Sequence, residues 1–290
     1  MNRQPVYLVL GSAGILGNAF LNRLDAMSSS YRVFEFIHEK VDITEPGEVN
    51  PVIEYIRPTV VINCAAINNE DFCQEAKSGA FRVNSKGPQV LAESCDKYGA
   101  KLVHFSSAHV FDGSRCTPYT ERIKTNPINI LGQSKISGEE AIKKTTDNYL
   151  IVRPGWVFSA DYSWVTEWIA AAERDEPIAV IEDEIGSPVY APDLVDATLD
   201  LLAREAKGLF HVSNSNAATR AQVLEATLEL SNIKTKVERV TLESQKLFKA
   251  PLPRYTCLSN KKYNQFVGKE IRSWTDALKH CLFTMQKYRP

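Results

Sequence analysis

The sequence lacks any apolar run close to the roughly 20 residues that a membrane-spanning helix requires. An apolar strand follows the N-terminus at once, with no basic leader before a cleavage site, so we expect no secretory signal. The six cysteines form no Cys-x-x-Cys pair, which argues against a zinc site or a disulfide framework and favours reduced thiols. Together these absences predict a cytoplasmic protein without a membrane partner.

The chain also has no excess of charge of one sign. Its 34 basic residues nearly balance its 35 acidic residues, and the formal net charge is -1. Such a chain has no global field to attract a polyanion, so we expect no nucleic-acid partner. The acidic run at residues 182–184 cannot direct three consecutive side chains at one ion and is typical of a solvated loop. We therefore predict no required metal.

What the sequence does contain is a regular alternation of strands and helices. Short β-branched or aromatic runs recur before segments of helical periodicity, at residues 6–10, 31–37, 59–63, 101–106 and 149–153. This alternation predicts an α/β protein with a Rossmann-type, doubly wound parallel sheet. Farther on, amphipathic stretches at 165–174, 191–203 and 221–231 are separated by short strands at 178–181 and 208–212. This second pattern predicts a smaller, mixed α/β lobe.

A glycine-rich segment, Gly11-x-x-Gly14-x-x-Gly17, lies between the first strand and the first helical segment. In that context the backbone N–H groups approach a pyrophosphate, which the positive end of the helix dipole stabilises. The predicted cofactor contacts are Gly11, Ala13, Gly14, Ile15, Leu16 and Gly17. We therefore expect residues 1–155 to form an NAD(P)-binding domain and residues 156–290 a substrate-binding lobe, with an approximate boundary and a chain that crosses between the two.

The end of the second strand bears on the choice of cofactor. Ile37 occupies the position where an acidic residue would bind the ribose of NAD, and residues 38–40 (His-Glu-Lys) slightly favour NADP over NAD. Farther along, Asp42 has two open interpretations. It accepts a hydrogen bond from the adenine amino group, or it caps the helix that follows Pro46.

Several motifs are shared with a known family. They lie at residues 60–66 (VVINCAA), 104–113 (HFSSAHVFDG), 127–135 (PINILGQSK), 153–157 (RPGWV), 186–188 (GSP), 253–255 (PRY) and 274–278 (WTDAL), with Asp71, Asn84, Pro118, Tyr119, Glu121, Asp193 and Leu194 between them. Over nearly its whole length the chain resembles the extended short-chain dehydrogenase/reductase family, most closely its dTDP-4-dehydrorhamnose reductase branch. The resemblance implies an oxidoreductase that reduces the 4-keto group of a nucleotide-linked sugar with NADP or NAD. It also implies cofactor contacts at Asp42, Ile43, Cys64, Ala65, Ala66, Asn84 and Lys135.

The resemblance also implies a catalytic set. In the family a Ser or Thr orients the carbonyl, a phenol of a Tyr-x-x-x-Lys pair donates the proton, and the lysine lowers the phenol pKa and holds the ribose. Ser107 and Lys135 match these positions residue by residue. The position of the tyrosine holds Leu131. Since leucine can neither give nor take a proton, catalysis is the least secure part of the resemblance.

Two replacement donors are considered. His109 follows the catalytic strand and is either a surrogate proton donor or an ordinary packed histidine. Tyr119, in the next loop, is either a donor or a packing residue. Asn129 precedes the helix that carries Lys135 and is expected to cap it in preference to contacting a ligand.

On the substrate side, Trp156 matches a family aromatic that lines the cleft, or it is a core aromatic between the lobes. Two more positions depart from the family. Ala108 stands where the family has Asp, and Leu252 stands where it has the Arg before Pro253 that would hold the phosphates. We consider Arg254 as the residue that contacts the phosphates instead.

These observations leave two hypotheses. The first is a nicotinamide-dependent reductase of a nucleotide-linked 4-keto-deoxysugar. The second is a catalytically degenerate NAD(P)-binding homologue that acts as a regulatory or assembly subunit, since degeneration would spare the glycine turn and lose the proton donor. An epimerase or dehydratase of the same superfamily needs the same tyrosine and meets the same objection. A homodimer is possible on general grounds.

Overall fold

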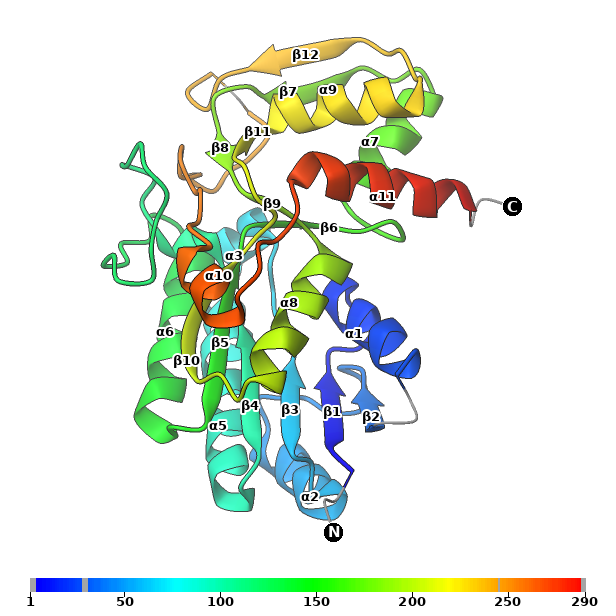
Figure 1. Ribbon diagram of the computed structural model, residues 1–290. Coiled ribbons are helices and arrows are strands. Elements are labelled where there is room, and N and C mark those ends of the chain that lie inside the picture. The colour runs from blue at the N-terminus through cyan, green and yellow to red at the C-terminus, as the bar shows by residue number, and fades with distance from the viewer. Residues whose placement is uncertain (1–3, 28–30, 245, 288–290) are drawn as a thin grey trace.

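The computed structural model describes residues 4–27, 31–244 and 246–287. Its centre is a six-stranded parallel sheet with the order β10-β5-β4-β3-β1-β2 (Figure 1). The strands are β1 (Val6–Leu10), β2 (Arg32–Phe36), β3 (Val60–Asn63), β4 (Lys101–Phe105), β5 (Tyr149–Pro154) and β10 (Gly208–Val212). The predicted Rossmann-type sheet is confirmed, and its first five strands lie where the sequence placed them, within one residue at each end.

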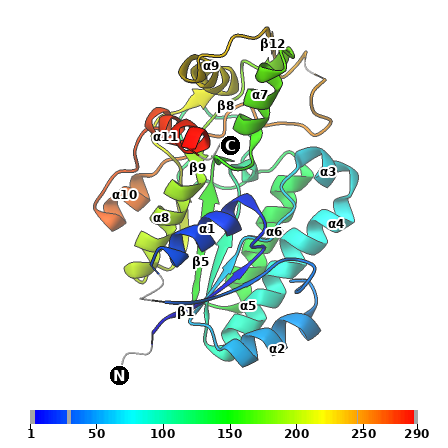
Figure 2. The ribbon, with the colours of Figure 1, turned by 90° about the vertical axis from the view of Figure 1, so that its right-hand side faces the viewer.

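Helices cover both faces of this sheet, which explains its near-continuous apolar strands (Figure 2). One face carries α1 (Ile15–Asp25), α8 (Ala191–Ala203) and α10 (Lys261–Val267), and the other carries α2 (Pro46–Ile56), α5 (Gly87–Tyr98) and α6 (Ile130–Thr145). Successive strand residues serve opposite cores, since Val9 packs under the first set and Leu8 under the second.

The predicted place of residues 208–212 in the smaller lobe is wrong. The strand β10 pairs in parallel with β5, with Phe210 opposite Val152, and forms an edge of the main sheet. Buried Phe210 and Val212 pack in the core beneath α8. A short apolar strand does not reveal which sheet it joins, because its pairing partner lies far away in the sequence. The chain therefore returns to the main sheet, while the division at residues 155 and 156 stays a prediction.

The smaller lobe is mixed α/β, as predicted, and lies beyond the carboxyl ends of the main strands (Figure 1). Its strands pair as β6 with β9, β7 with β12 and β8 with β11. They are β6 (Trp156–Phe158), β7 (Ile178–Ile181), β8 (Ile185–Gly186), β9 (Pro188–Tyr190), β11 (Ala218–Thr219) and β12 (Val237–Val240), and the helices are α7 (Trp164–Glu173), α9 (Arg220–Ser231) and α11 (Trp274–Lys287). Two apolar clusters under these helices form its core.

Short helical turns fill the space between the main strands and the smaller lobe. After β3 come α3 (Glu70–Glu75), α4 (Lys77–Phe81) and a π-helical turn, η1 (Arg82–Lys86), and after β4 comes a 3₁₀ turn, η2 (Ala108–Val110). All of them contact α6. They therefore surround the helix that carries Lys135.

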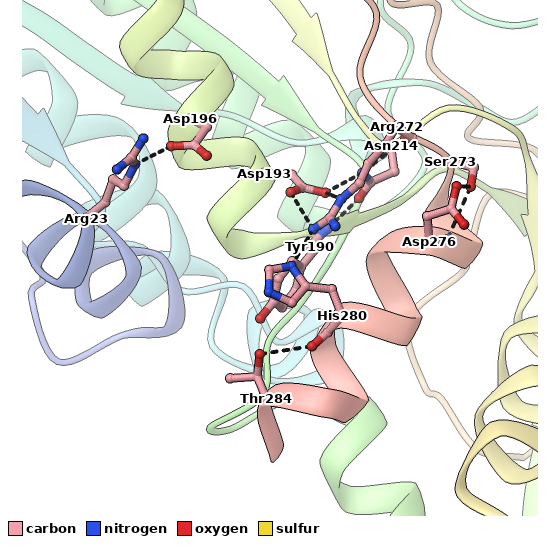
Figure 3. A network of polar contacts seen from close by, with 10 residues as sticks. All are labelled: Arg23, Tyr190, Asp193, Asp196, Asn214, Arg272, Ser273, Asp276, His280 and Thr284. Atoms are coloured by element: carbon pink, nitrogen blue, oxygen red, sulfur yellow. Dashed lines mark hydrogen bonds and ion pairs between the residues drawn. The ribbon is translucent and has the colours of Figure 1, made fainter. Parts of the chain in front are cut away.

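A polar network joins the two lobes (Figure 3). Arg272, just before α11, donates hydrogen bonds of 2.8 Å to both carboxylate oxygens of Asp193 in the first turn of α8. Asn214, after β10, donates to the same carboxylate at 2.7 Å and accepts from the backbone N–H of Tyr190. A bidentate pair with low exposure fixes orientation better than a single surface contact does, so this junction holds α11 against the main lobe.

Within the part of the chain that the structure describes, no helix is long and apolar enough to cross a membrane.

Candidate cofactor and substrate site

The glycine turn begins where β1 ends. Gly11 has a φ of +74°, and its N–H donates to the carbonyl of Phe36 at 3.0 Å, which ties the turn to the end of β2. A Cβ on Gly11 would lie 2.5 Å from the backbone N of Ala65, and one on Gly17 would lie 2.3 Å from the carbonyl O of Gly11. Only glycine fits at these two positions, because the neighbouring atoms are backbone and cannot rotate away.

Gly14 has a different role from its two neighbours in the motif. It is the N-cap of α1, and a Cβ there would come no closer than 3.5 Å to any atom. No side chain caps α1, and Ala13 and Gly14 are exposed. The uncapped N–H groups and the positive end of the helix dipole therefore face open space, which fits a pyrophosphate.

Asp42 is already engaged by the protein. Its carboxylate accepts from the backbone N–H of Thr44 at 2.9 Å and from Arg82 at 2.5 Å. Although desolvation opposes ionisation, these contacts hold the pKa of Asp42 below its ordinary value. The capping interpretation is wrong, because the N-cap of α2 is Glu45 and Asp42 instead closes a turn onto Thr44. The adenine contact of Asp42 stays a prediction.

The other predicted cofactor residues lie around the ends of β2 and β3. Ile43 is buried in the core, where its side chain fills the space above Gly87. Residues 64–66 follow β3, and the N–H of Ala65 donates to the side chain of Asn63 at 3.1 Å. The amide of Asn84 bonds to both backbone groups of Ile67, at 2.9 and 2.8 Å. Asn84 therefore fixes the loop after β3, and its cofactor contact stays a prediction.

Ser107 stands just beyond the end of β4 and is half-buried. Its Oγ accepts a hydrogen bond from the backbone N–H of His109 at 3.1 Å. Because the oxygen is the acceptor in this contact, the hydroxyl proton is left to donate to another group. Ser107 is thus able to orient a carbonyl oxygen, as the resemblance implies.

Lys135 lies inside the protein, with 1 % of its surface exposed. Its Nζ donates to the carbonyl of Phe105 at 3.2 Å, which places the amine at the carboxyl end of β4, two residues before Ser107. Burial lowers the pKa of Lys135 to about 8. The structure therefore brings Lys135 and the strand end that leads to Ser107 together.

Leu131 lies one helical turn before Lys135, in the first turn of α6. It is buried in an apolar cluster with Cys73, Ala80 and Ile130, beneath α3 and α4. No member of this cluster carries a group that is an effective proton donor at neutral pH, since burial raises the pKa of the Cys73 thiol to about 11. The first turn of α6 thus supplies packing and no acid.

His109 has partners at both ring nitrogens. Its Nδ1 lies 3.2 Å from the side-chain amide nitrogen of Asn129, and its Nε2 lies 3.4 Å from a carboxylate oxygen of Glu70. Asn129 caps α6, as predicted, because its Oδ1 accepts from the N–H of Gly132 at 2.9 Å. The amide nitrogen must then donate to His109, which assigns the ring proton to Nε2. This arrangement favours the packed-histidine interpretation, and the donor role of His109 stays a prediction.

Tyr119 also has a packing environment. Its ring stacks on Phe111 with the centroids 4.0 Å apart, and its hydroxyl donates to Asp112 at 3.0 Å. Buried at 2 % exposure, it holds the loop after η2.

The two predicted substrate residues occupy different environments. Trp156 follows β5 and is buried at 6 % exposure, with its ring 4.4 Å from the guanidinium carbon of Arg220. Arg254 is exposed, and its NH2 lies 3.4 Å from Asp183. The structure gives no direct contact between Trp156 and Arg254, and their substrate roles stay predictions.

A buried ion pair beneath the site was missed from the sequence. Glu139 accepts two hydrogen bonds from Arg153, at 2.7 and 2.8 Å, and both side chains are almost wholly buried. Although burial alone would raise it, the pKa of Glu139 is held at about 2 by Arg153. The pair fixes α6 on β5 and so positions Lys135. No signal within α6 reveals the pair, because Arg153 lies on the next strand.

The carboxylates of Asp183 and Glu184, in the acidic run at residues 182–184, have separate partners. Asp183 accepts from the N–H of Leu242 at 2.7 Å, whereas Glu184 pairs with Arg220 at 2.6 Å. Among the described residues, no group of three His, Cys, Asp or Glu side chains is arranged as metal ligands.

A parallel sheet, a glycine turn after β1 and a buried lysine at the end of β4 define a Rossmann-type protein of the extended short-chain dehydrogenase/reductase class. Within this class the chain belongs to the family described as "RmlD substrate binding domain", whose model matches residues 6–287.

Known relatives cover almost the whole chain. The spore coat polysaccharide biosynthesis protein SpsK of Bacillus subtilis is 32% identical over 95% of this chain and 96% of its own length. A dTDP-4-dehydrorhamnose reductase of Mycolicibacterium smegmatis is 31% identical over 95% of this chain and 84% of its own. The solved structure of a dTDP-4-dehydrorhamnose reductase from Bacillus anthracis in complex with NADP is 29% identical, with a TM-score of 0.93 over 97% of this chain and 100% of that one.

Proposed function

We propose that this protein is a nicotinamide-dependent reductase of a nucleotide-linked 4-keto-deoxysugar, of the dTDP-4-dehydrorhamnose reductase type. The observation that carries the proposal is the buried Lys135 at the end of β4, two residues before the available hydroxyl of Ser107 and beyond an intact glycine turn. Relatives about 30% identical over nearly the full chain, with reductase names, support the same reaction class.

The glycine turn would hold the pyrophosphate of the cofactor, with Gly14 leaving room for it and Gly11 and Gly17 fixing the turn. Lys135 would hold the nicotinamide ribose. The bound cofactor supplies a hydride to the carbonyl carbon of the substrate. NADP is favoured over NAD because a related structure is a complex with NADP, because Ile37 stands where an acid would bind the ribose of NAD, and because residues 38–40 (His-Glu-Lys) lean slightly toward NADP.

Ser107 and Leu131 set the character of the reaction. Ser107 donates a hydrogen bond to the substrate carbonyl and so orients it for hydride transfer. Because Leu131 has no acidic group, the proton for the product alkoxide comes from water or from His109 and limits the rate. General acid catalysis contributes roughly a hundredfold to ten-thousandfold, so we expect a slow reductase.

The test is a titration of the protein with NADPH and NADH, followed by a dTDP-linked 4-keto-6-deoxysugar, with the nicotinamide absorbance as the readout. Saturable NADPH binding and a loss of absorbance that falls in Ser107→Ala support the proposal. If His109 supplies the proton, His109→Gln lowers kcat and flattens its pH profile; an unchanged profile assigns the proton to water.

A second candidate is a cofactor-binding subunit that has lost catalysis. The observation in its favour is the apolar cluster around Leu131, together with the engagement of both ring nitrogens of His109. Saturable NADPH binding without any keto-sugar turnover, in a protein that alters the activity of a partner enzyme, would establish this candidate.

Two further proposals concern the setting of the protein. A cytoplasmic location is supported by the cysteines, none of which forms a disulfide in the described part of the chain. A homodimer is supported by the prevalence of twofold assemblies among soluble oligomers, and light scattering of the purified protein would measure it.

A further inference from the structure

Arg220 is held by an ion pair and two aromatic rings, but its guanidinium is only partly hydrogen-bonded. Its Nε donates to Glu184 at 2.6 Å, and its guanidinium carbon lies 4.4 Å from the ring of Trp156 and 5.7 Å from the ring of Trp164. Its side chain keeps 15% of its surface exposed. The two terminal nitrogens meet no hydrogen-bond acceptor among the described residues. The positive charge is therefore fixed between two indoles, with four N–H donors directed elsewhere.

Two buried polar atoms on the residues that contact this guanidinium also have no partner. The indole Nε1 of Trp156 is buried without an acceptor, and so is the Oε1 of Glu184 without a donor. Leaving a buried polar group unpaired costs about 1–3 kcal/mol, so such groups are rare in folded proteins. Unpaired donors on Trp156 and Arg220 fit an anionic group, and the free oxygen of Glu184 fits a hydroxyl of the same ligand.

The cluster of Arg220, Trp156 and Glu184 lies near the carboxyl end of the main sheet. Trp156 comes two residues after the end of β5, and Arg220 directly follows β11. The carboxyl ends of parallel strands are where α/β proteins bind ligands. The indole of Trp156 covers Gly186 in β8, where an added Cβ would lie 2.3 Å from the ring. Because Gly186 has no side chain, the indole of Trp156 can pack against its backbone, next to Arg220.

The neighbouring segment offers no equivalent cation. The strand β8 pairs with β11 on one side, and on the other Ile185 bonds to Arg254 and Thr256, at 2.8 and 2.7 Å. In that second segment Leu252 carries no charge, and the exposed Arg254 is paired with Asp183. Arg220 follows β11, which lies about 10 Å from the segment of Arg254, two strand spacings across β8. Of these two arginines, only Arg220 is held by neighbouring side chains while both of its terminal nitrogens stay unpaired.

We propose that Arg220, seated on Trp156 and fixed by Glu184, binds the diphosphate of the nucleotide-linked substrate. A planar guanidinium with two free terminal nitrogens matches two phosphate oxygens. The inference rests on the proposed function for the class of substrate. It assigns the phosphate contact to Arg220 and withdraws it from Arg254.

The test measures binding by calorimetry, with no turnover required. The probes are the diphosphates of thymidine, uridine and guanosine, each compared with its nucleoside. To avoid leaving a buried carboxylate unpaired, Arg220→Gln is combined with Glu184→Gln, and Glu184→Gln alone serves as its control. Arg220→Lys keeps the charge and loses the planar fork. Arg254→Gln is the matched control for an arginine on the opposite side of β8.

We expect the double variant to weaken diphosphate binding about tenfold or more, with nucleoside and NADPH binding unchanged. Arg220→Lys should fall between the double variant and the wild type, and Arg254→Gln should stay within about twofold of the wild type. Glu184→Gln alone keeps the guanidinium but loosens its support, so its loss of diphosphate binding should be smaller than that of the double variant. Unchanged diphosphate binding in the double variant, an equal loss in Arg254→Gln, or no diphosphate binding by the wild type overturns the inference. Arg220-dependent diphosphate binding without keto-sugar reduction contradicts the proposed function and leaves this inference standing.

Discussion

The glycine turn and the first turn of α6 both lie at the carboxyl end of the main sheet but are built on different principles. At the turn, Gly11, Gly14 and Gly17 work through backbone geometry, and the surrounding backbone leaves no choice of residue at two of the three. At α6 the chemistry depends on single side chains, and Leu131 offers only an apolar one. The turn therefore depends on the absence of side chains at Gly11 and Gly17, whereas proton transfer depends on the presence of one acidic side chain.

The two regions also differ in their exposure. Ala13 and Gly14 face solvent, whereas Lys135 and the Glu139–Arg153 pair beneath it are buried. The turn is thus ready for a ligand without rearrangement. The lysine is held at an energetic cost, because burial opposes its charge.

Leu131→Tyr tests whether one side chain accounts for the missing proton donor in the first turn of α6. A phenol one turn before Lys135 restores a proton donor, and we expect kcat for keto-sugar reduction to rise by about a hundredfold or more. Leu131→Phe is the matched control, since it adds the same ring without the hydroxyl. Equal kcat values in Leu131→Tyr and Leu131→Phe would show that the hydroxyl does not act as the proton donor.

Gly17→Ala breaks the backbone-built region. Its Cβ would lie 2.3 Å from the carbonyl of Gly11, so α1 must move away from β1. We expect NADPH affinity, measured by fluorescence titration, to fall by about a hundredfold, which corresponds to roughly 2.7 kcal/mol. Gly47→Ala, where an added Cβ meets nothing within 4 Å, should bind NADPH as the wild type does. A wild-type affinity for Gly17→Ala contradicts the packing argument.

Glu139→Gln tests the support of α6. It leaves the buried Arg153 unpaired, and we expect the free energy of unfolding in urea to fall by about 3 kcal/mol at neutral pH. Glu176→Gln breaks an exposed pair with Arg174 and should lower the free energy of unfolding far less, because solvent screens that pair.

The pH dependence of this variant has a defined sign. The pKa of Glu139 is about 2 in the folded protein and 4.5 ordinarily, so its contribution is complete above pH 4.5 and is lost as the pH falls toward 2. Buried His104 and His211, whose pKa values are lowered to about 3 by desolvation, also destabilise the protein in acid, but they are present in both proteins. The stability difference between wild type and Glu139→Gln should therefore shrink below pH 4.5. A constant difference contradicts the assignment.

Lys135→Met should stabilise the cofactor-free protein while abolishing reduction. The folded-state pKa of Lys135 is about 8 against an ordinary 10.5, so between these values the unfolded chain binds a proton that the folded chain does not. The contribution of Lys135 to stability therefore rises with pH from 8 to 10.5. Buried thiols and phenols whose pKa values are raised by burial lower the stability of both proteins over the same range, so the difference in free energy of unfolding between the wild type and Lys135→Met should show the rise. The same slope in both proteins means that Lys135 is not desolvated.

The sequence was sufficient for local features. The five strands of the first half, the glycine turn and the Asn129 cap follow from runs and spacings a few residues long. The predictions that failed concern contacts between distant segments. The edge position of β10 depends on its pairing with β5. Asp42 is the exception, since the turn that it forms onto Thr44 is local, and only its ion pair with Arg82, 40 residues away, is not.

The site shows the same division. Ser107 and Lys135 were found through a motif, whereas three pairs or stacks were not: Glu139 with Arg153, His109 with Glu70, and Trp156 with Arg220. No pattern within one segment announces a partner in another. A single sequence shows which residues are present but not which distant residues are in contact.

The most direct test of the account is a single-turnover reaction of NADPH-loaded protein with a dTDP-linked 4-keto-6-deoxysugar, in wild type and Leu131→Tyr. The account predicts slow oxidation of NADPH by the wild type, stoichiometric formation of the reduced sugar, and a rate raised about a hundredfold by the tyrosine. Saturated NADPH binding with no oxidation in either protein would contradict it.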